Sequence, residues 1–293
     1  MNYFKLKQYF VESLSSIYEE PELESIFFLL LDELYSISRI DYSLNKQKEV
    51  DFEIENKLKQ NIIELKQNKP VQHILGYGYC LGRKFKVSKD VLIPRRETEE
   101  LIDLILKNHK NQEQRIIDIG TGTACISINL KLESPQFEVL ALDVSENVLA
   151  IAQENARHFK SLIHFQQMNI LESKEWNVFE NNTFDIIVSN PPYVRNKEKG
   201  EMHKNVLDYD PELALFVDDN NPLVFYTRIL QFAGKKLRKG GFLYFEINEA
   251  FANEIVDLMK SFLFVDIQIV NDLYGKQRFV YGKKSKKGSF DLV

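Results

Sequence analysis

The sequence predicts an α/β protein in which a doubly wound sheet domain follows a small helical bundle. After residue 112, short apolar runs alternate with helical stretches, a pattern typical of a sheet covered by helices on both faces. Before residue 70, apolar residues recur three and four positions apart with charges between them, which is helical periodicity. Glycines, aromatics and alternating residues from 76 to 91 predict a hairpin-like connector. We therefore expect three parts, over residues 1–75, 76–92 and 93–293.

The helical part and the sheet part each divide into predicted elements. Helices are expected over Tyr3–Tyr18, Leu23–Ile37 and Phe52–Leu65, and Pro21 suits the first turn of the second helix. The expected strands are 115–119, 137–142, 162–167, 184–189, 241–247, 264–270 and 278–283. Because no helical stretch separates the last two strands, we expect them to run antiparallel.

The composition indicates an ordinary globular protein of the cytoplasm. The 293 residues are 44% hydrophobic and carry a formal charge of −5, which gives no broad basic surface for nucleic acid. Cys80 and Cys125 show neither Cys-x-x-Cys spacing nor a nearby histidine cluster, so we expect reduced thiols and no metal. The longest apolar run, Ile26–Leu31, is far shorter than the ~20 residues that span a bilayer, so no membrane partner is expected. The five scattered histidines are expected at the surface or at helix caps.

A glycine-rich turn follows the first predicted strand, within Arg115–Cys125. Glycines let the backbone turn sharply and approach a ligand without an intervening side chain. A dinucleotide fingerprint would place a third glycine where Cys125 stands, and a phosphate-binding loop would need a Gly-Lys-Ser or Gly-Lys-Thr ending. The pattern therefore favours the looser turn that binds S-adenosylmethionine, which has no pyrophosphate.

Asp143 ends the second predicted strand, 23 positions after Gly120. This spacing is close to the ~20 positions expected for a carboxylate that accepts hydrogen bonds from ribose hydroxyls. The alternative is that Asp143 caps the following helix, Glu146–His158, although Ser145 suits that role equally well.

The segment Asn190-Pro191-Pro192-Tyr193 directly follows the apolar strand 184–189. In an open α/β sheet, ligands bind at the carboxyl ends of the strands. Two prolines fix two φ angles and remove two backbone donors, so the loop presents rigid acceptors beside an aromatic ring. A planar –NH2 group fits such a site, because its two N–H bonds need two acceptors. The alternative is an ordinary turn that closes the strand.

With these motifs the chain resembles the glutamine N5-methyltransferases of peptide chain release factors, the family known as PrmC or HemK. The resemblance runs from about residue 70 almost to the end. Beside the turn, Asp143 and the Asn-Pro-Pro-Tyr loop, it includes Gln72–Gly76, Leu92–Glu99, Asp210–Leu215 and Tyr274–Val280. The Asn-Pro-Pro-Tyr motif is shared with DNA and RNA amino-methyltransferases, whereas the Ile-Pro-Arg block followed by Glu-Thr-Glu is much narrower.

The resemblance implies a fold, an activity and a partner. The expected fold is a Rossmann-like, seven-stranded class I methyltransferase domain. The expected activity is methyl transfer from S-adenosylmethionine to the side-chain amide nitrogen of the glutamine in the Gly-Gly-Gln motif of release factors, which supports translation termination. The helical domain would hold the release factor, or else would only stabilise the fold.

The site residues follow from the motifs and the resemblance. The Asn190 side-chain oxygen and the Pro191 carbonyl would each accept one N–H of the glutamine. Pro192 would complete the substrate site, and Tyr193 would stack on the amide or merely pack as an aromatic ring. The expected cofactor-binding residues are Asp118, Gly120, Thr121, Gly122, Thr123, Ala124, Asp143, Asn169, Ile170 and Asn190.

Two positions depart from the family pattern. Asn169, which with Ile170 would border the adenine, stands where an aspartate is common, and Ala124 stands where a third glycine is usual. Alanine is tolerable if Ala124 has helical φ and ψ. In that case Ala124→Gly should change cofactor affinity little.

Arg95 and Arg96 would contact substrate or cofactor, or else form ion pairs with Glu97 or Glu99. Three rival functions remain open. A ribosomal-protein glutamine methyltransferase would have the same site, and an adenine-N6 or cytosine-N4 methyltransferase of DNA or RNA would bind the same –NH2 group. A decayed, non-catalytic binding module is the third, against which the intact glycines, Asp143 and Asn190 argue.

Overall fold

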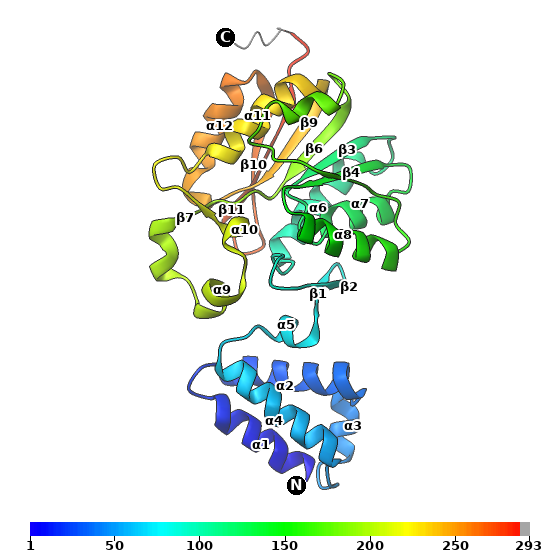
Figure 1. The fold of residues 1–293 in the computed structure, drawn as a ribbon, viewed down its shortest axis with the longest axis vertical. Helices are drawn as coiled ribbons and strands as arrows, with labels where there is room; N and C mark the ends of the chain where they lie inside the picture. Colours follow the sequence, from blue (N-terminus) through cyan, green and yellow to red (C-terminus); the bar gives the residue numbers. More distant parts are fainter. Residues whose placement is uncertain (288–293) are drawn as a thin grey trace. The chain divides into compact units, whose positions relative to one another are not determined.

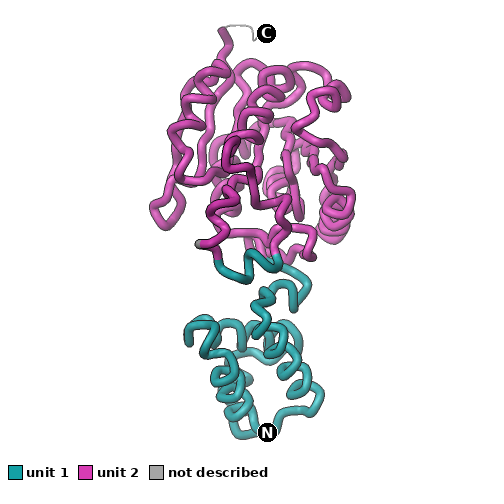
Figure 2. Tube along the Cα trace, turned by 60° about the vertical axis from the view of Figure 1, so that its left-hand side comes forward, with its two compact units in different colours: residues 1–78, 203–209 teal, residues 79–202, 210–293 magenta. Residues whose placement is uncertain are grey.

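The computed structural model describes residues 1–287. The chain forms two compact units (Figure 2): residues 1–78 with 203–209, and residues 79–202 with the described residues from Asp210 onward. The division at residues 75 and 92 stays a prediction. Among the described residues, no helix is both long and apolar enough to cross a membrane.

The first unit is helical, as predicted. Its helices are α1 (Tyr3–Leu14), α2 (Glu20–Tyr35), α3 (Arg39–Leu44), α4 (Phe52–Lys66), α5 (Val71–Leu75) and α9 (Lys204–Tyr209). Leu6, Phe10, Phe27 and Leu58 are fully buried between α1, α2 and α4. Pro21 lies in the first turn of α2, where no backbone donor is missed.

The second unit contains a seven-stranded sheet in the order β10-β11-β9-β6-β3-β4-β5. The strands are β3 (Arg115–Ile119), β4 (Glu138–Asp143), β5 (His164–Gln167), β6 (Phe184–Ser189), β9 (Leu237–Glu246), β10 (Phe264–Asn271) and β11 (Gln277–Lys284). The first five run parallel, and β11 is antiparallel to both β9 and β10. The seven predicted strands and the antiparallel finish are thereby confirmed.

Helices cover both faces of this sheet (Figure 1) because its strands are apolar on both sides. Ile116 packs in a cluster with α6 (Arg96–His109), α7 (Cys125–Glu133) and α8 (Glu146–His158). Its neighbour Ile117 packs on the opposite face, in a cluster with α11 (Val224–Lys236) and α12 (Ala252–Ser261). The two-residue period of a strand thus divides adjacent isoleucines between two cores.

Short elements complete the fold. β1 (Tyr77–Cys80) and β2 (Arg83–Lys86) form the predicted hairpin connector. β7 (Val194–Arg195) pairs in parallel with β8 (Phe216–Val217). The sequence does not predict this pair, because two residues are too few to show the alternation of a strand. The remaining elements are η1 (Glu175–Val178), η2 (Asn196–Glu201), α10 (Glu212–Leu215) and η3 (Glu249–Phe251).

His109 is neither at the surface nor a cap, contrary to the expectation for the histidines. Its ring is buried at the end of α6 and forms a hydrogen bond of 2.8 Å with the Tyr244 hydroxyl. Burial lowers the pKa of His109 to about 4, because a charged imidazolium is poorly solvated there.

Candidate active site

The candidate site lies where the strand order of the sheet reverses. From β3 the chain proceeds to β4 and β5, then returns to β6 beside β3 and continues to β9. Ligands of open α/β sheets bind at such a switch point, beyond the carboxyl ends of the strands. The Ser189 hydroxyl donates to the Ile119 carbonyl at 2.7 Å, which joins the ends of β6 and β3. The glycine turn and Asn190 therefore begin at neighbouring points.

The glycine turn is held from inside by Asp118. One oxygen of this fully buried carboxylate accepts the hydroxyls of Thr121 at 2.6 Å and Ser127 at 2.7 Å. Burial raises the pKa of Asp118 to about 6, although both hydroxyls oppose that rise. Asp118 thus orients the turn through Thr121 and Ser127.

The turn is also anchored to β4. The N–H groups of Gly120 and Thr121 both donate to the Leu142 carbonyl, at 3.0 and 2.8 Å. Gly120 and Gly122 have φ of +75° and +56°, which glycine adopts without strain. A Cβ built at either glycine would meet no heavy atom within 4 Å among the described residues, so the turn leaves room for a ligand.

Ala124 does not have helical φ and ψ, so the expectation that alanine is tolerated there as a helical residue is wrong. It has φ 62° and ψ 24° and precedes α7 as a left-handed cap residue. The Ala124 N–H donates to the Thr121 carbonyl at 2.9 Å. With this contact in place, the left-handed conformation of Ala124 directs the chain from the turn into α7. A left-handed L-residue costs about 1–2 kcal/mol, which explains why glycine is usual at this position.

Asp143 lies against the turn. Its Oδ2 accepts the Gly122 N–H at 3.2 Å, and its Oδ1 accepts the Ser145 N–H at 3.1 Å. Burial raises the pKa of this carboxyl group. Ser145, whose hydroxyl accepts the Val148 N–H at 3.4 Å, is the N-cap of α8, so the capping role belongs to Ser145.

Asn169 and Ile170 follow β5. They lie near Asp143, because the Asp143 carbonyl accepts the N–H of Met168, the residue before Asn169, at 2.9 Å. The Asn169 N–H donates to the Glu175 carboxylate at 2.8 Å, and the Asn169 Oδ1 accepts the Leu171 N–H at 3.0 Å. The segment is therefore fixed by local contacts, including one from Glu175 that the sequence did not indicate.

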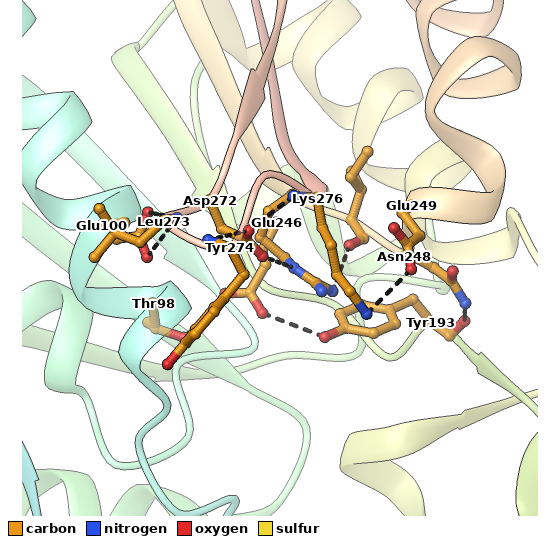
Figure 3. Close-up of polar contacts among 12 residues, drawn as sticks. Thr98, Glu100, Tyr193, Glu246, Asn248, Glu249, Asp272, Leu273, Tyr274 and Lys276 are labelled. Carbon is orange, nitrogen blue, oxygen red and sulfur yellow. Dashed lines mark hydrogen bonds and ion pairs between the residues drawn. The ribbon is translucent and has the colours of Figure 1, made fainter. Parts of the chain in front are cut away.

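The Asn-Pro-Pro-Tyr loop connects β6 to β7. Pro191 is buried, while Asn190, Pro192 and Tyr193 are partly exposed. The Tyr193 ring packs against the hydrophobic cluster that includes α11. The backbone carbonyl of Tyr193 accepts a hydrogen bond from Nδ2 of Asn248 at 3.4 Å (Figure 3). Burial raises the pKa of Tyr193, so its hydroxyl keeps its proton.

Two residues without a predicted role, Thr98 and Glu246, contact this loop. Asn190 Nδ2 donates to the Thr98 hydroxyl oxygen at 3.3 Å, and the Thr98 hydroxyl donates to Glu246 Oε2 at 2.9 Å. The Tyr193 hydroxyl donates to Glu246 Oε1 at 3.3 Å, as Figure 3 shows. In the sequence, Glu246 could have been identified as a candidate site residue only by its position as an acid at the end of an apolar strand.

Arg95 pairs with Asp210 and not with Glu97 or Glu99. Its Nη2 lies 2.6 Å from Oδ2 of the buried Asp210 carboxylate. Arg96 is exposed and forms no ion pair with either glutamate within residues 1–287. The ion pair expected with Glu97 or Glu99 is therefore wrong for Arg95, whose partner lies 115 positions away.

The strand order, the glycine turn after β3 and the open α/β arrangement define a class I methyltransferase fold. A family model described as "Methyltransferase small domain" matches residues 97–209, and one described as "PrmC N-terminal domain" matches residues 5–76. A methyltransferase structure from Pyrococcus furiosus aligns with 78% of this chain and 99% of its own, with a TM-score of 0.53 and 18% identity. This likeness confirms the predicted fold.

Relatives of this chain carry the name release factor glutamine methyltransferase. The Flavobacterium psychrophilum protein is 42% identical over 92% of this chain and 95% of its own length. The Bacteroides thetaiotaomicron protein is 38% identical over 94% and 98%. The chain belongs to the release factor glutamine methyltransferase family, as its resemblance indicated.

Proposed function

We propose that this chain methylates the side-chain amide nitrogen of the glutamine in the Gly-Gly-Gln motif of peptide chain release factors. The observation that carries the proposal is the rigid Asn-Pro-Pro-Tyr loop at the switch point, in a chain of this family. Family membership implies S-adenosylmethionine as the methyl donor, and this cofactor supplies a methyl group on an electrophilic sulfonium. The helical unit would hold the protein substrate.

The contacts of the turn fit the amino-acid end of this cofactor. The backbone N–H groups of the turn already have acceptors within the protein. Those of Gly120 and Thr121 donate to the Leu142 carbonyl, and that of Gly122 donates to the Asp143 carboxylate. The turn therefore offers carbonyl oxygens, which suit an α-ammonium group and not a phosphate. Space above both glycines supports the same role. Thr123 and Ala124 would complete the turn.

Asp143 and the segment after β5 would hold the nucleoside. The Asp143 oxygens accept the N–H groups of Gly122 and Ser145, and a carboxylate has lone pairs beyond these for a ribose hydroxyl. Asn169 and Ile170 lie beside Asp143 and would border the adenine. The Asn169 Oδ1 already accepts one N–H, and its Nδ2 is a donor that the usual aspartate lacks.

Catalysis would consist mainly of positioning the amide. An amide nitrogen is a weak nucleophile because its lone pair is delocalised into the carbonyl. The Asn190 Oδ1 and the Pro191 carbonyl would each accept one N–H, which aims the nitrogen at the methyl group. Such positioning can supply as much as about 7–11 kcal/mol, and fixed acceptors stabilise positive charge that builds on nitrogen.

The test is a methyl-transfer assay with labelled S-adenosylmethionine and, in parallel, a release factor, ribosomal proteins and DNA. We expect one methyl group on the Gly-Gly-Gln glutamine, located by mass spectrometry. Asn190→Ala should lower turnover at least about a hundredfold and leave cofactor affinity nearly unchanged, whereas Asp143→Ala should first weaken cofactor affinity. Asn111→Ala, at an exposed asparagine before β3, is the matched control. Label in ribosomal protein or DNA instead would overturn the partner.

A further inference from the structure

We propose that Thr98 and Glu246 are positioning residues that fix which end of the Asn190 carboxamide faces the substrate. The inference rests on the proposed function, in which Asn190 Oδ1 must accept a substrate N–H. It adds two residues that do not touch the substrate but act through one that does.

The direction of each hydrogen bond in the network follows from the number of protons available. When Glu246 is ionised it can only accept, and it accepts the single Thr98 hydroxyl proton at 2.9 Å. Once that proton is committed, the Thr98 oxygen can only accept from Asn190. Asn190 must therefore present Nδ2 to Thr98, as it does at 3.3 Å, and keep Oδ1 on the other side.

The orientation matters because the two ends of a carboxamide have nearly the same size and opposite hydrogen-bonding character. Packing alone does not distinguish the oxygen from the –NH2 group. A reversed Asn190 would direct two N–H donors toward the –NH2 group of the substrate, where neither side has an acceptor. The first acceptor of the proposed mechanism would then be lost without any change in shape.

The inner hydrogen bond of the network is shielded from water, because Thr98 and Glu246 are both buried. Glu246 also accepts the Tyr193 hydroxyl at 3.3 Å on its second oxygen (Figure 3). The charged and titratable groups around Glu246 are Glu97 of α6, Tyr193, Tyr226 of α11 and Arg278 of β11. Burial raises the pKa of Glu246 to about 7, while Thr98 and Arg278 favour the carboxylate.

The first test compares Thr98→Val, which keeps the shape and removes the hydroxyl, with Thr98→Ser, which keeps the hydroxyl. Thr98→Val should lower kcat at least about tenfold on a release factor with cofactor Kd unchanged, and Thr98→Ser should stay within about twofold of the wild type. In an Asn190→Ala background, Thr98→Val should have no further effect, because it acts only through Asn190. Full activity of Thr98→Val beside an inactive Asn190→Ala would overturn this inference and leave the proposed function intact.

A second readout does not depend on turnover. In a nitrogen-labelled, substrate-free protein, the side-chain –NH2 resonance of Asn190, assigned by its loss in Asn190→Ala, should move in Thr98→Val and stay in place in Thr98→Ser. A resonance unmoved in both variants refutes the network even if the protein methylates nothing offered. If Thr98→Val fails to fold, Glu246→Leu takes its place with Glu246→Gln, which retains an acceptor for Thr98, as the conservative partner. Equal activity of these two variants would also count against the inference.

Discussion

Replacement of Ala124 by glycine tests whether the left-handed residue at the start of α7 is strained. Ala152, inside α8, is a matched control, because both alanines are fully buried in the same hydrophobic cluster. The two differ in backbone conformation: Ala124 has φ 62°, whereas Ala152 lies in a regular helix. Ala124→Gly and Ala152→Gly therefore remove the same methyl group from two different conformations.

The expected free energies of unfolding follow from three contributions. Each substitution loses a buried methyl group, worth about 0.8 kcal/mol, and glycine adds unfolded-state freedom worth about 0.4–1 kcal/mol. In α8 these losses should lower stability by about 1–2 kcal/mol, at or above the ~1 kcal/mol that the low helix propensity of glycine costs by itself. At Ala124 the release of about 1–2 kcal/mol of left-handed strain offsets them. Ala124→Gly should therefore be nearly neutral, with a difference of about 1–2 kcal/mol between the variants.

The assay is urea unfolding followed by tryptophan fluorescence. The chain has one tryptophan, Trp176, which is 2% exposed in the unit that contains α7 and α8. If Ala124→Gly destabilises this unit as much as Ala152→Gly does, the strain argument is wrong. Calorimetry with S-adenosylmethionine should show a change of less than about tenfold in cofactor affinity for Ala124→Gly, since glycine adopts the same φ without cost. A larger loss would mean that the methyl group itself shapes the cofactor site.

Two further predictions concern buried ionisable groups. The His109 pKa is about 4 in the folded protein, against 6.5 for a histidine side chain in water. The unfolded chain therefore binds more protons between these values, and His109 lowers stability by up to about 3 kcal/mol as pH falls from 6.5 to 4. His109→Gln should flatten the unfolding free energy over this pH range relative to the wild type; parallel curves would contradict the assignment. Arg95→Ala leaves the Asp210 carboxylate, with a side chain 2% exposed, without its cation. Because the Arg95 side chain is 41% exposed, we expect a loss of about 1–2 kcal/mol, and Arg96→Ala, at an exposed position, should change stability by less than about 0.5 kcal/mol. Equal effects of both arginine substitutions would refute the role of the ion pair.

Features that repeat along the chain could be predicted from the sequence. Strands β3 and β6 are apolar on both faces, and the charged and polar segments between strands mark the helices. The backbone conformation of a single residue has no such repetition. Nothing in the identity of an alanine indicates φ 62° at Ala124, and the departure from the usual glycine was the one available warning. The partner of Arg95 lies 115 positions away, whereas Glu97 and Glu99 were visible nearby.

The sequence drew attention to site residues where a motif spacing applied. Asp143 was singled out because it ends the second predicted strand 23 positions after Gly120. Glu246 has no such spacing, but it also ends a parallel strand, β9, beside β6, and it is buried next to the Asn-Pro-Pro-Tyr loop. Thr98 could not be found in this way, since it lies 148 positions from Glu246 and is brought there by the packing of α6. An acid that ends an apolar strand in an open α/β sheet is therefore a site candidate by position alone, whereas its hydrogen-bond donors become visible only once the helices are packed.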